Sequence, residues 1–154
     1  MRIDSRLSRM LHVLLHMARH EGGALTSEQI AIMLGTNPVV VRRTMAGLRQ
    51  RGYVHSARGH GGGWTLAMDL AEVTLLDIHQ AVGGPVLFAL GNEHPTPSCG
   101  VEKVVNAAID GALQDAARLL EARLAQVTLA DLAAEFDALW SDGNAAVVAG
   151  DGRH

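Results

Sequence analysis

Apolar residues at helical spacing predict three consecutive helices in the first third of the chain. The first helix starts after a cap at Asp4 or Ser5 and runs to about His20. Its buried face consists of Leu7, Leu11, Leu14 and Ala18. The glycine pair at 22–23 ends this helix, because glycine leaves the helical conformation easily.

Capping signals mark the boundaries of the second and third helices. Thr26 and Gln29 have the spacing of a capping box, in which each side chain accepts a backbone N–H, and Gly35 ends that helix. Asn37-Pro38 then supplies an N-cap followed by proline at the first helical position, where its missing N–H costs nothing. The third helix closes at Gly52.

The third helix has two distinct faces when its residues are placed about 100° apart. The buried face carries Val41, Thr44, Met45 and Leu48. The opposite face carries Val39, Arg43, Ala46 and Gln50, with Arg42 on its flank. Exposed arginine can pair with guanine and valine can contact a thymine methyl, so this is a candidate DNA-recognition helix. A solvated amphipathic helix is the alternative.

A β-hairpin with a glycine-rich tip is predicted after this helix. The strand-like run 53–56 leads to Arg58-Gly59-His60-Gly61-Gly62-Gly63-Trp64-Thr65-Leu66. The glycines allow positive φ angles and close approach to a phosphate backbone, and Arg58 can enter a narrow, strongly negative minor groove. The order helix, strand, tip, strand is that of a winged helix-turn-helix, whose hairpin is called the wing.

The remaining residues predict further helices. Thr74 caps a short helix ending at the glycines 83–84, a long helix runs from about Cys99 to Gln126, and Thr128 caps a last one. We therefore expect a DNA-binding domain at 1–83, a loop at 84–98, dimerisation helices at 99–141 and a disordered tail at 142–154. The fold class is mainly α with a small β-hairpin wing.

The long helix is too apolar along its length to be a solvated arm. Its apolar positions are Val101, Val105, Ala108, Ala112, Leu113, Ala116, Leu120 and Leu124. Only one small domain stands beside it, so a second copy of the chain is the expected partner. Such a homodimer reads a palindromic operator in double-stranded DNA, because the dimer two-fold relates two half-sites.

Composition is consistent with one cytoplasmic domain. The 154 residues are 48% hydrophobic but only 3% aromatic, which predicts an aliphatic core. No apolar stretch reaches the roughly 18 residues of a membrane span, and the N-terminus lacks the apolar core of a secretory signal. A single cysteine suits a reducing compartment.

The net charge of −3 conceals an uneven distribution. Residues 1–67 carry nine arginines against three acidic residues, whereas residues 68–154 carry four basic residues against thirteen acidic ones. Basic charge concentrated in the predicted DNA-binding half indicates a phosphate-binding surface. A chance split over a solvated surface is the alternative.

Three segments, at 25–31, 37–43 and 58–67, resemble the Rrf2 family of bacterial transcription regulators, which includes IscR-, NsrR- and CymR-like repressors. The likeness covers about residues 1–140. It implies a homodimer with a crossed long helix, a winged helix in each protomer and promoter binding. The expected DNA-binding residues are Thr26, Ser27, Asn37, Pro38, Val39, Arg42, Arg43, Arg58, Gly59 and His60.

The resemblance fails at the cysteines. Cluster-binding members carry three cysteines before the long helix; Cys99 matches the last, and Glu102 stands where some members have a histidine ligand. An iron–sulfur cluster needs about four ligands, so we expect no such cofactor. Cys99 follows Ser98, a good N-cap, and the first turn of the helix would stabilise its thiolate for redox or electrophile sensing. A small buried apolar residue is the alternative.

Two motifs suggest other chemistry. His12, His16 and His20 share a helix face and could bind a metal ion together with His94 and Cys99 in a dimer. A metal- or cofactor-loaded sensor is therefore the alternative function. The run 60–63 matches the oxyanion-hole motif of lipase-like hydrolases, but no serine stands in the Gly-x-Ser-x-Gly elbow that this chemistry requires. We therefore predict a repressor without enzymatic activity, whose signal the sequence does not identify.

Overall fold

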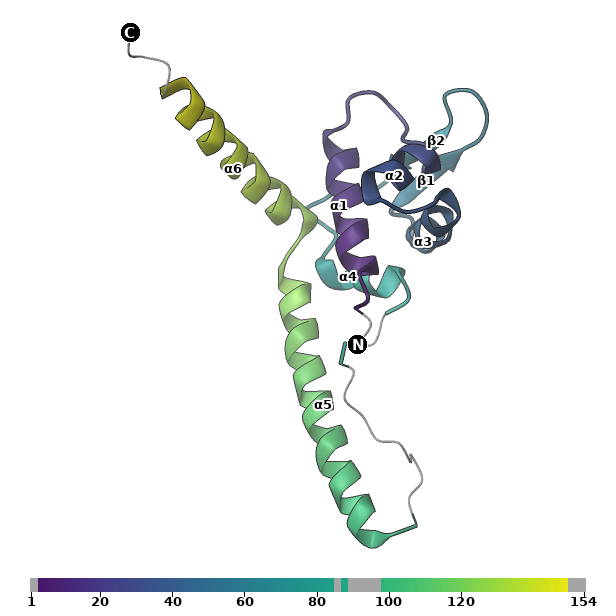
Figure 1. The fold of residues 1–154 in the computed structure, drawn as a ribbon, viewed down its shortest axis with the longest axis vertical. Helices are drawn as coiled ribbons and strands as arrows, with labels where there is room; N and C mark the ends of the chain where they lie inside the picture. The colour runs from purple at the N-terminus through teal and green to yellow at the C-terminus, as the bar shows by residue number, and fades with distance from the viewer. Residues whose placement is uncertain (1–2, 85–86, 89–97, 150–154) are drawn as a thin grey trace.

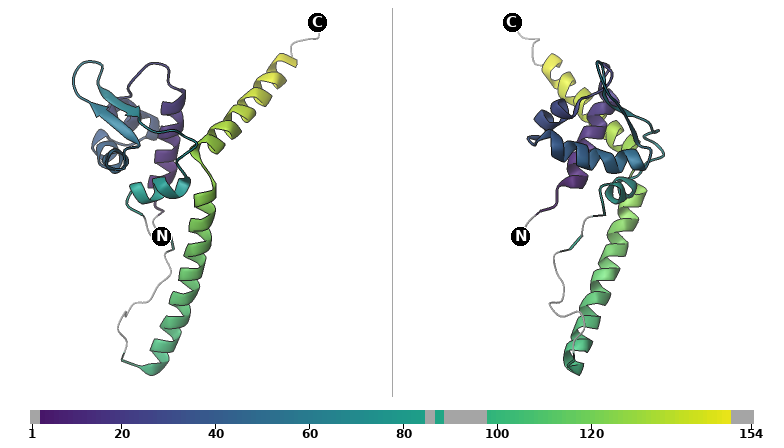
Figure 2. Two further views of the ribbon diagram at one scale, coloured as in Figure 1. Left: turned by 180° about the vertical axis from the view of Figure 1, so that it is seen from behind. Right: turned by 90° about the vertical axis from the view of Figure 1, so that its right-hand side faces the viewer.

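The computed structural model describes residues 3–84, 87–88 and 98–149, in which helices and one hairpin pack around a core (Figure 1). Its elements are α1 (Arg6–Arg19), α2 (Ser27–Leu34), α3 (Pro38–Gln50), β1 (Val54–Ala57), β2 (Gly63–Leu66), α4 (Leu75–Ala81), α5 (Gly100–Gln126) and α6 (Leu129–Ala149). The helices α1 to α4 and the hairpin form one body, while α5 and α6 lead away from it in different directions (Figures 1 and 2).

Side-chain caps start α1 and α2 where the sequence predicts. Asp4 caps α1, because its Oδ1 accepts a hydrogen bond from the backbone N–H of Arg6 at 3.0 Å, whereas Ser5 makes no capping bond. In α2 the Thr26 hydroxyl accepts from the N–H of Gln29 at 3.1 Å, and Gln29 Oε1 accepts from the N–H of Thr26 at 2.8 Å. These reciprocal bonds confirm the capping box and satisfy donors that the helix itself leaves open.

The boundaries of α3 are also set locally. Asn37 Oδ1 accepts from the backbone N–H groups of Val39 and Val40 at 3.0 and 3.1 Å, and the half-buried Pro38 occupies the first helical position. At the other end Gly52 adopts a φ of +77°, a left-handed conformation that glycine tolerates without strain. The structure therefore confirms both predicted ends of this helix.

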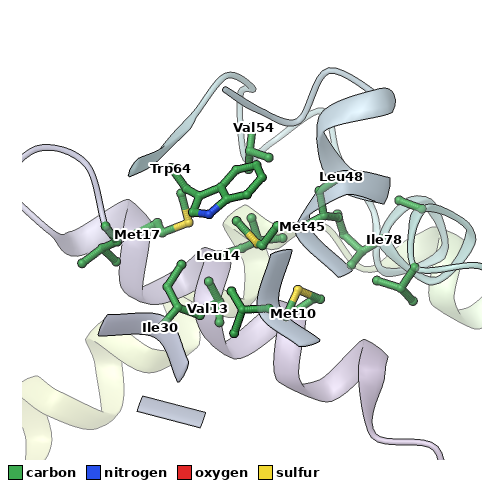
Figure 3. Packing of buried hydrophobic residues seen from close by; sticks show 14 of the residues in the cluster. Met10, Val13, Leu14, Met17, Ile30, Met45, Leu48, Val54, Trp64 and Ile78 are labelled. Carbon is green, nitrogen blue, oxygen red and sulfur yellow. The ribbon is translucent and has the colours of Figure 1, made fainter. Parts of the chain in front are cut away.

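The core consists of buried aliphatic side chains from α1 to α4, the hairpin and the start of α6 (Figure 3). Its largest fully buried members are Val13, Leu14, Ile30, Val41, Met45, Leu48, Val54, Ile78 and Leu129. Trp64 joins them from β2 with 7% of its surface exposed. The predicted aliphatic core is thus confirmed, with one indole added on the hairpin side.

Packing on two sides fixes the orientation of α3. Val41, Met45 and Leu48 are at most 1% exposed and confirm the predicted buried face. Gly47 lies so close to the C-terminal end of α4 that a Cβ there would stand 2.1 Å from the carbonyl oxygen of Ala81. Because protein interiors are close-packed, a helix held in this way has little freedom to rotate. Its remaining face is presented to solvent.

The hairpin is joined to the segment that precedes α2. β1 and β2 pair antiparallel, with Val54 opposite Leu66, and β1 begins one residue after the predicted start at Tyr53. A further bridge pairs Leu25 with Trp64: the N–H of Leu25 donates to the Trp64 carbonyl at 3.0 Å, and the Trp64 N–H donates back at 2.8 Å. The wing is therefore connected to the helix-turn-helix on its β2 side.

The junction between α5 and α6 is fastened to the segment that follows the wing. The N–H of Leu75 donates to the Val127 carbonyl at 2.9 Å, and the N–H of Leu129 donates to the Val73 carbonyl at 3.0 Å. Consequently α5 leaves the domain from a fixed point and extends away from the other helices (Figure 2). None of the described helices combines the length and the apolar character that a membrane crossing needs.

The first turns of α6 are also attached to α1. Arg19 of α1 forms an ion pair with Asp137 of α6. The guanidinium carbon of Arg19 lies 4.6 Å from the centre of the Phe136 ring, within the range of a cation–π contact.

Two predicted boundaries differ from the structure. α6 runs to Ala149, so the helix continues into the segment from 142 that the sequence assigned to a disordered tail; its alanine-rich end favours helix. α5 begins at Gly100, so Cys99 is itself the N-cap residue, with extended φ and ψ of −79° and 130°, and not a residue of the first turn. Residues 150–154 and most of the predicted loop 84–98 lie outside the described residues.

Candidate nucleic-acid interface

The outer face of α3 is exposed, as the helical phase predicts. Val39 is 58% exposed, Arg43 and Gln50 are exposed beside it, and Ala46 is half-buried. One cation, one amide and several methyl groups therefore share a single helix face. Base edges in the DNA major groove present acceptors, donors and thymine methyls that match such a mixture.

A cleft of about 470 Å³ separates α3 from the hairpin, with the start of α2 as its third side. Arg42 and Arg49 line it from α3, Arg58 from the wing and Glu28 from α2. The hairpin wall includes the glycines 59, 62 and 63, which have no side chains. Since three guanidinium groups face one carboxylate, the cleft attracts anions.

Two of the three arginines have partners within the protein. Arg42 Nη1 lies 3.4 Å from Glu28 Oε1, and both side chains are more than half exposed, so this ion pair adds little stability. Arg49 Nη1 donates to Ser56 Oγ at 3.2 Å, which links α3 to β1. Arg58 forms no ion pair with any residue of the described part of the chain.

A buried hydrogen bond fixes the wing against α2. Trp64 Nε1 donates to Ser27 Oγ at 3.0 Å, and the two residues are 7% and 8% exposed. Gly63 allows this approach, because its φ is +137° and a Cβ there would stand 2.6 Å from the Leu25 carbonyl oxygen. The wing therefore keeps a set position relative to the helix-turn-helix.

The tip of the wing is a tight turn that projects beyond the strands (Figure 1). The N–H of Gly62 donates to the carbonyl of Gly59 at 3.0 Å, and Gly61 has a φ of +74°. A type II turn requires such a left-handed residue at its third position, which explains the glycine there. Arg58 and His60 are exposed on this tip.

Some residues that we expected to contact DNA are engaged within the protein. The Thr26 hydroxyl and Asn37 Oδ1 cap α2 and α3, and the Ser27 hydroxyl accepts the indole N–H. The sequence already indicated the capping bonds of Thr26 and Asn37, which are local. It did not indicate the bond of Ser27, which reaches a distant segment of the chain. The side chains therefore shape the interface, and the exposed cations and Val39 face solvent.

The structure separates Arg42 from Arg43. Arg42 lines the cleft beside the wing, whereas Arg43 lies at a second hollow of about 280 Å³ that Arg6 and Gln50 also line. Arg49 was not among the predicted DNA-binding residues, yet it shares the flank of Arg42. Arg42 and Arg49 are seven positions apart, which is close to two helical turns, so their spacing in the sequence could have placed both on one side of the helix.

Cys99 is exposed at the N-terminus of α5. The backbone N–H groups of Glu102 and Val101 hold the pKa of its thiol below the usual value, because they stabilise the thiolate. A larger thiolate fraction at neutral pH raises the reactivity of the sulfur toward oxidants. In the single chain, the alternative of a buried apolar cysteine is wrong.

The histidines of α1 do not form a metal site in the described part of the chain. His12 and His16 are exposed with ring centres 4.7 Å apart, and His20 is exposed at the end of the helix. The described residues contain no group of three or more histidine, cysteine or acidic side chains that could hold a metal ion. His94 lies outside them.

Comparison with known proteins identifies the family. The profile of Rrf2, described as an iron-dependent transcriptional regulator, matches residues 3–135. The chain belongs to the Rrf2 family. It is also 36% identical over 131 residues to YwnA of Bacillus subtilis strain 168, a protein named as an HTH-type transcriptional regulator. This match covers 84% of the chain and 96% of YwnA.

Solved structures show the same fold. A protein from Lactobacillus plantarum described as a transcriptional regulator superposes with a TM-score of 0.73 at 23% identity, over 93% of this chain and 99% of that one. CymR, the global cysteine regulator of Bacillus subtilis, superposes with a TM-score of 0.58 at 23% identity, over 88% and 98%. The winged-helix prediction is confirmed. Rrf2 proteins are DNA-binding transcription regulators and not enzymes, which removes the hydrolase alternative.

The family description mentions iron, but the donors of this Rrf2 chain do not fit an iron–sulfur cluster. Cys99 is its only cysteine. The thiol at the start of α5 lies beside backbone N–H groups, which donate hydrogen bonds and cannot ligate iron. Since such clusters take about four ligands, mostly thiolates, one chain does not supply the set.

We predict that Ser27→Ala lowers the free energy of unfolding by about 1–3 kcal/mol, because it leaves the buried Trp64 N–H without its acceptor. Urea denaturation followed by tryptophan fluorescence measures this loss. Ser56→Ala is the matched control: it removes an exposed hydroxyl and should change stability by less than about 0.5 kcal/mol. Equal losses for the two variants would contradict the anchoring role of Ser27.

Proposed function

We propose that this Rrf2 protein is a homodimeric repressor that reads a palindromic operator in double-stranded DNA. The observation that carries the proposal is the exposed outer face of α3, which stands beside an arginine-lined cleft and a glycine-tipped wing. Such an arrangement can follow DNA from the major groove across its backbone to the minor groove. A dimer bound across a promoter would exclude the transcription machinery.

In this proposal α3 lies in the major groove. Val39 and Arg43, on the outer face, meet base edges, and Arg43 is suited to guanine O6 and N7. Asn37 uses its oxygen for capping but keeps its amide N–H donors for the DNA backbone. Pro38 fixes the start of the helix, and Arg42 approaches from the flank that faces the wing.

In the same proposal, the wing binds the minor groove. Arg58 is exposed beside the turn and enters a narrow groove, with His60 at the tip and Gly59 allowing close approach of the backbone. Thr26 and Ser27 line the cleft at the positive N-terminal end of α2. They contribute by their position there, since their oxygens already accept hydrogen bonds.

The exposed surface of α5 supports dimerisation. None of its residues is buried in the single chain, and apolar side chains such as Val101, Val104 and Leu119 are between 71% and 75% exposed. Apolar patches of this kind on a helix mark an interface. Two copies related by a two-fold axis across α5 would pair these helices antiparallel and present two α3 helices to two half-sites.

Cys99 is the proposed sensor. At about 1.5 Å per residue, the 27 residues of α5 place Cys99 roughly 40 Å from the α5–α6 junction of its own chain. In an antiparallel pair that end of α5 approaches the junction of the partner, so modification would act on the partner's DNA-binding domain. Peroxide would convert the thiolate to a sulfenic acid: the S–O bond forms as the O–O bond breaks, and hydroxide leaves and takes a proton from solvent to become water.

We predict that Arg43→Ala and Arg58→Ala weaken operator binding in different sequence contexts. Loss of Arg43 should cost about 1–3 kcal/mol and relax base preference at one position per half-site. Loss of Arg58 should weaken binding most on AT-rich flanks, where the minor groove is narrow. Fluorescence anisotropy on operator variants measures both effects. An Arg43→Ala loss that is uniform over unrelated sequences would assign Arg43 to phosphate alone.

We predict that Val105→Glu and Leu120→Glu give folded monomers with poor operator binding. Both positions are exposed in the single chain and lie on the apolar stripe of α5, so a carboxylate there disturbs the partner and not the internal core. Light scattering gives the oligomeric state. Gln114→Glu, on the opposite side of the helix, is the control and should remain dimeric. Dimers in all three variants would place the interface elsewhere.

We predict that mild peroxide lowers the DNA affinity of protein purified without oxygen, and that Cys99→Ser binds DNA equally well before and after the oxidant. Because the pKa of Cys99 is lowered, its reaction rate should level off at a lower pH than that of a free cysteine. Anisotropy titrations and thiol mass changes follow the two steps. A wild-type affinity that oxidation leaves unchanged sinks the sensor proposal.

A further inference from the structure

We propose that the cleft between α3 and the wing seats one phosphodiester of the DNA backbone, held by Arg49 and Ser56, while Arg42 and Arg58 add positive charge on either side of it. This inference rests on the proposed function and assigns the contact that sets the register between α3 and the wing. Arg49 and Ser56 were not expected to contact DNA from the sequence.

The geometry of DNA requires something to fill this cleft. The major and minor grooves of a duplex are separated by a sugar-phosphate strand, so a protein that occupies both must straddle that strand. In this chain the two straddling elements are α3 and the hairpin, and the space between them is the cleft of about 470 Å³. This volume is in the range of sites that take a small organic ligand, enough for one phosphodiester and its neighbouring sugars.

The side chains of the cleft have the chemistry of a phosphate site. The Arg49 guanidinium uses one N–H for Ser56 Oγ, and its remaining donors can bind two phosphate oxygens together. Ser56 accepts that bond through its oxygen, so its own O–H remains to donate to the same anion. The hydrogen bond between them thus orients both groups toward one ligand.

Charge in the cleft also favours an anion. Arg42 is paired with Glu28, which leaves Arg49 and Arg58 as uncompensated cations on its two walls. A bound phosphate would relieve their repulsion and take the place of counterions. The glycines of the hairpin wall leave room for the sugar-phosphate chain to come close.

The rigidity of the cleft gives this contact its consequence. The Trp64–Ser27 hydrogen bond holds the hairpin, and the close contact at Gly47 holds α3, so the width between the two walls is set before DNA arrives. A phosphate seated there fixes where α3 lies in one groove relative to Arg58 in the next. The contact carries no base information, because every nucleotide has the same phosphate.

The experiment combines Arg49→Ala with operators in which single phosphates are replaced, one at a time, by uncharged methylphosphonates. Wild-type protein should lose affinity strongly at one position per half-site, between the bases read by Arg43 and the minor-groove step reached by Arg58. Arg49→Ala should lose much less at that position than wild type, because the Ser56 hydroxyl and the neighbouring arginines still interact with the same phosphate. Its salt dependence, d log K/d log[salt], should become shallower by about 2 per dimer, one phosphate per protomer.

Matched variants keep the test specific. Arg118→Ala removes the same charge from the exposed surface of α5 and should leave the salt slope and the methylphosphonate profile unchanged. Ser56→Ala should weaken binding less than Arg49→Ala but at the same phosphate. Base preference across operator variants should be the same for Arg49→Ala and wild type.

Two failures are distinguishable. If Arg43→Ala and Arg58→Ala show their expected context dependence but Arg49→Ala loses as much affinity as wild type at every phosphate position, the phosphate seat is wrong and the proposed function stands. If wild-type protein shows no preference for any operator, the proposed function itself is wrong. Altered base preference in Arg49→Ala would also overturn the seat, because it would make Arg49 a base-reading residue.

Discussion

The winged helix depends on the hydrogen bond from Trp64 Nε1 to Ser27 Oγ and on the backbone pairing between Trp64 and Leu25. A two-stranded hairpin alone is marginally stable in water. Here the indole is buried in the core and its N–H is satisfied by the first residue of α2, so the hairpin becomes part of the domain. A buried indole N–H without an acceptor would cost more free energy than the hydrogen bond contributes, so hairpin positions that break this bond are disfavoured.

The fixed geometry of the winged helix also sets the directions of its arginine side chains. Arg42 and Arg43 are adjacent in sequence, yet one faces the wing and the other faces the hollow beside Arg6. The division follows from the tight packing of α3, which has little freedom to rotate because Gly47 lies against α4. A recognition helix fixed in this way can direct one arginine to bases and others to the backbone, because their directions are set in advance.

The second half of the chain has a different role. The ladder between the segment after the wing and the α5–α6 junction fixes the direction in which α5 departs, and the surface of α5 stays apolar and exposed. Acidic residues predominate in residues 68–154, whereas arginines predominate in residues 1–67. Phosphate and the acidic half carry like charge and repel each other, which supports the proposal that DNA binds at α3 and the wing.

Elements of this chain were predictable where the deciding interactions are local. The capping box of Thr26 and Gln29 and the Asn37 cap each join residues no more than three positions apart, so the sequence alone determined where α2 and α3 begin. The same holds for the glycine-rich turn, the buried face of α3 and its exposed face with Arg43. The family resemblance added the expectations of a homodimer with a crossed long helix and of promoter binding, and the family assignment confirmed the resemblance itself.

Only the tertiary structure decided what distant residues do together. Ser27 and Trp64 are far apart in sequence, and nothing in either segment shows that the serine hydroxyl would be buried under the indole. Arg49 joined the candidate site because Ser56 of the neighbouring strand lies beside it. Local patterns specify turns and helix ends through bonds within one turn, whereas these contacts exist only after the core has brought the elements together.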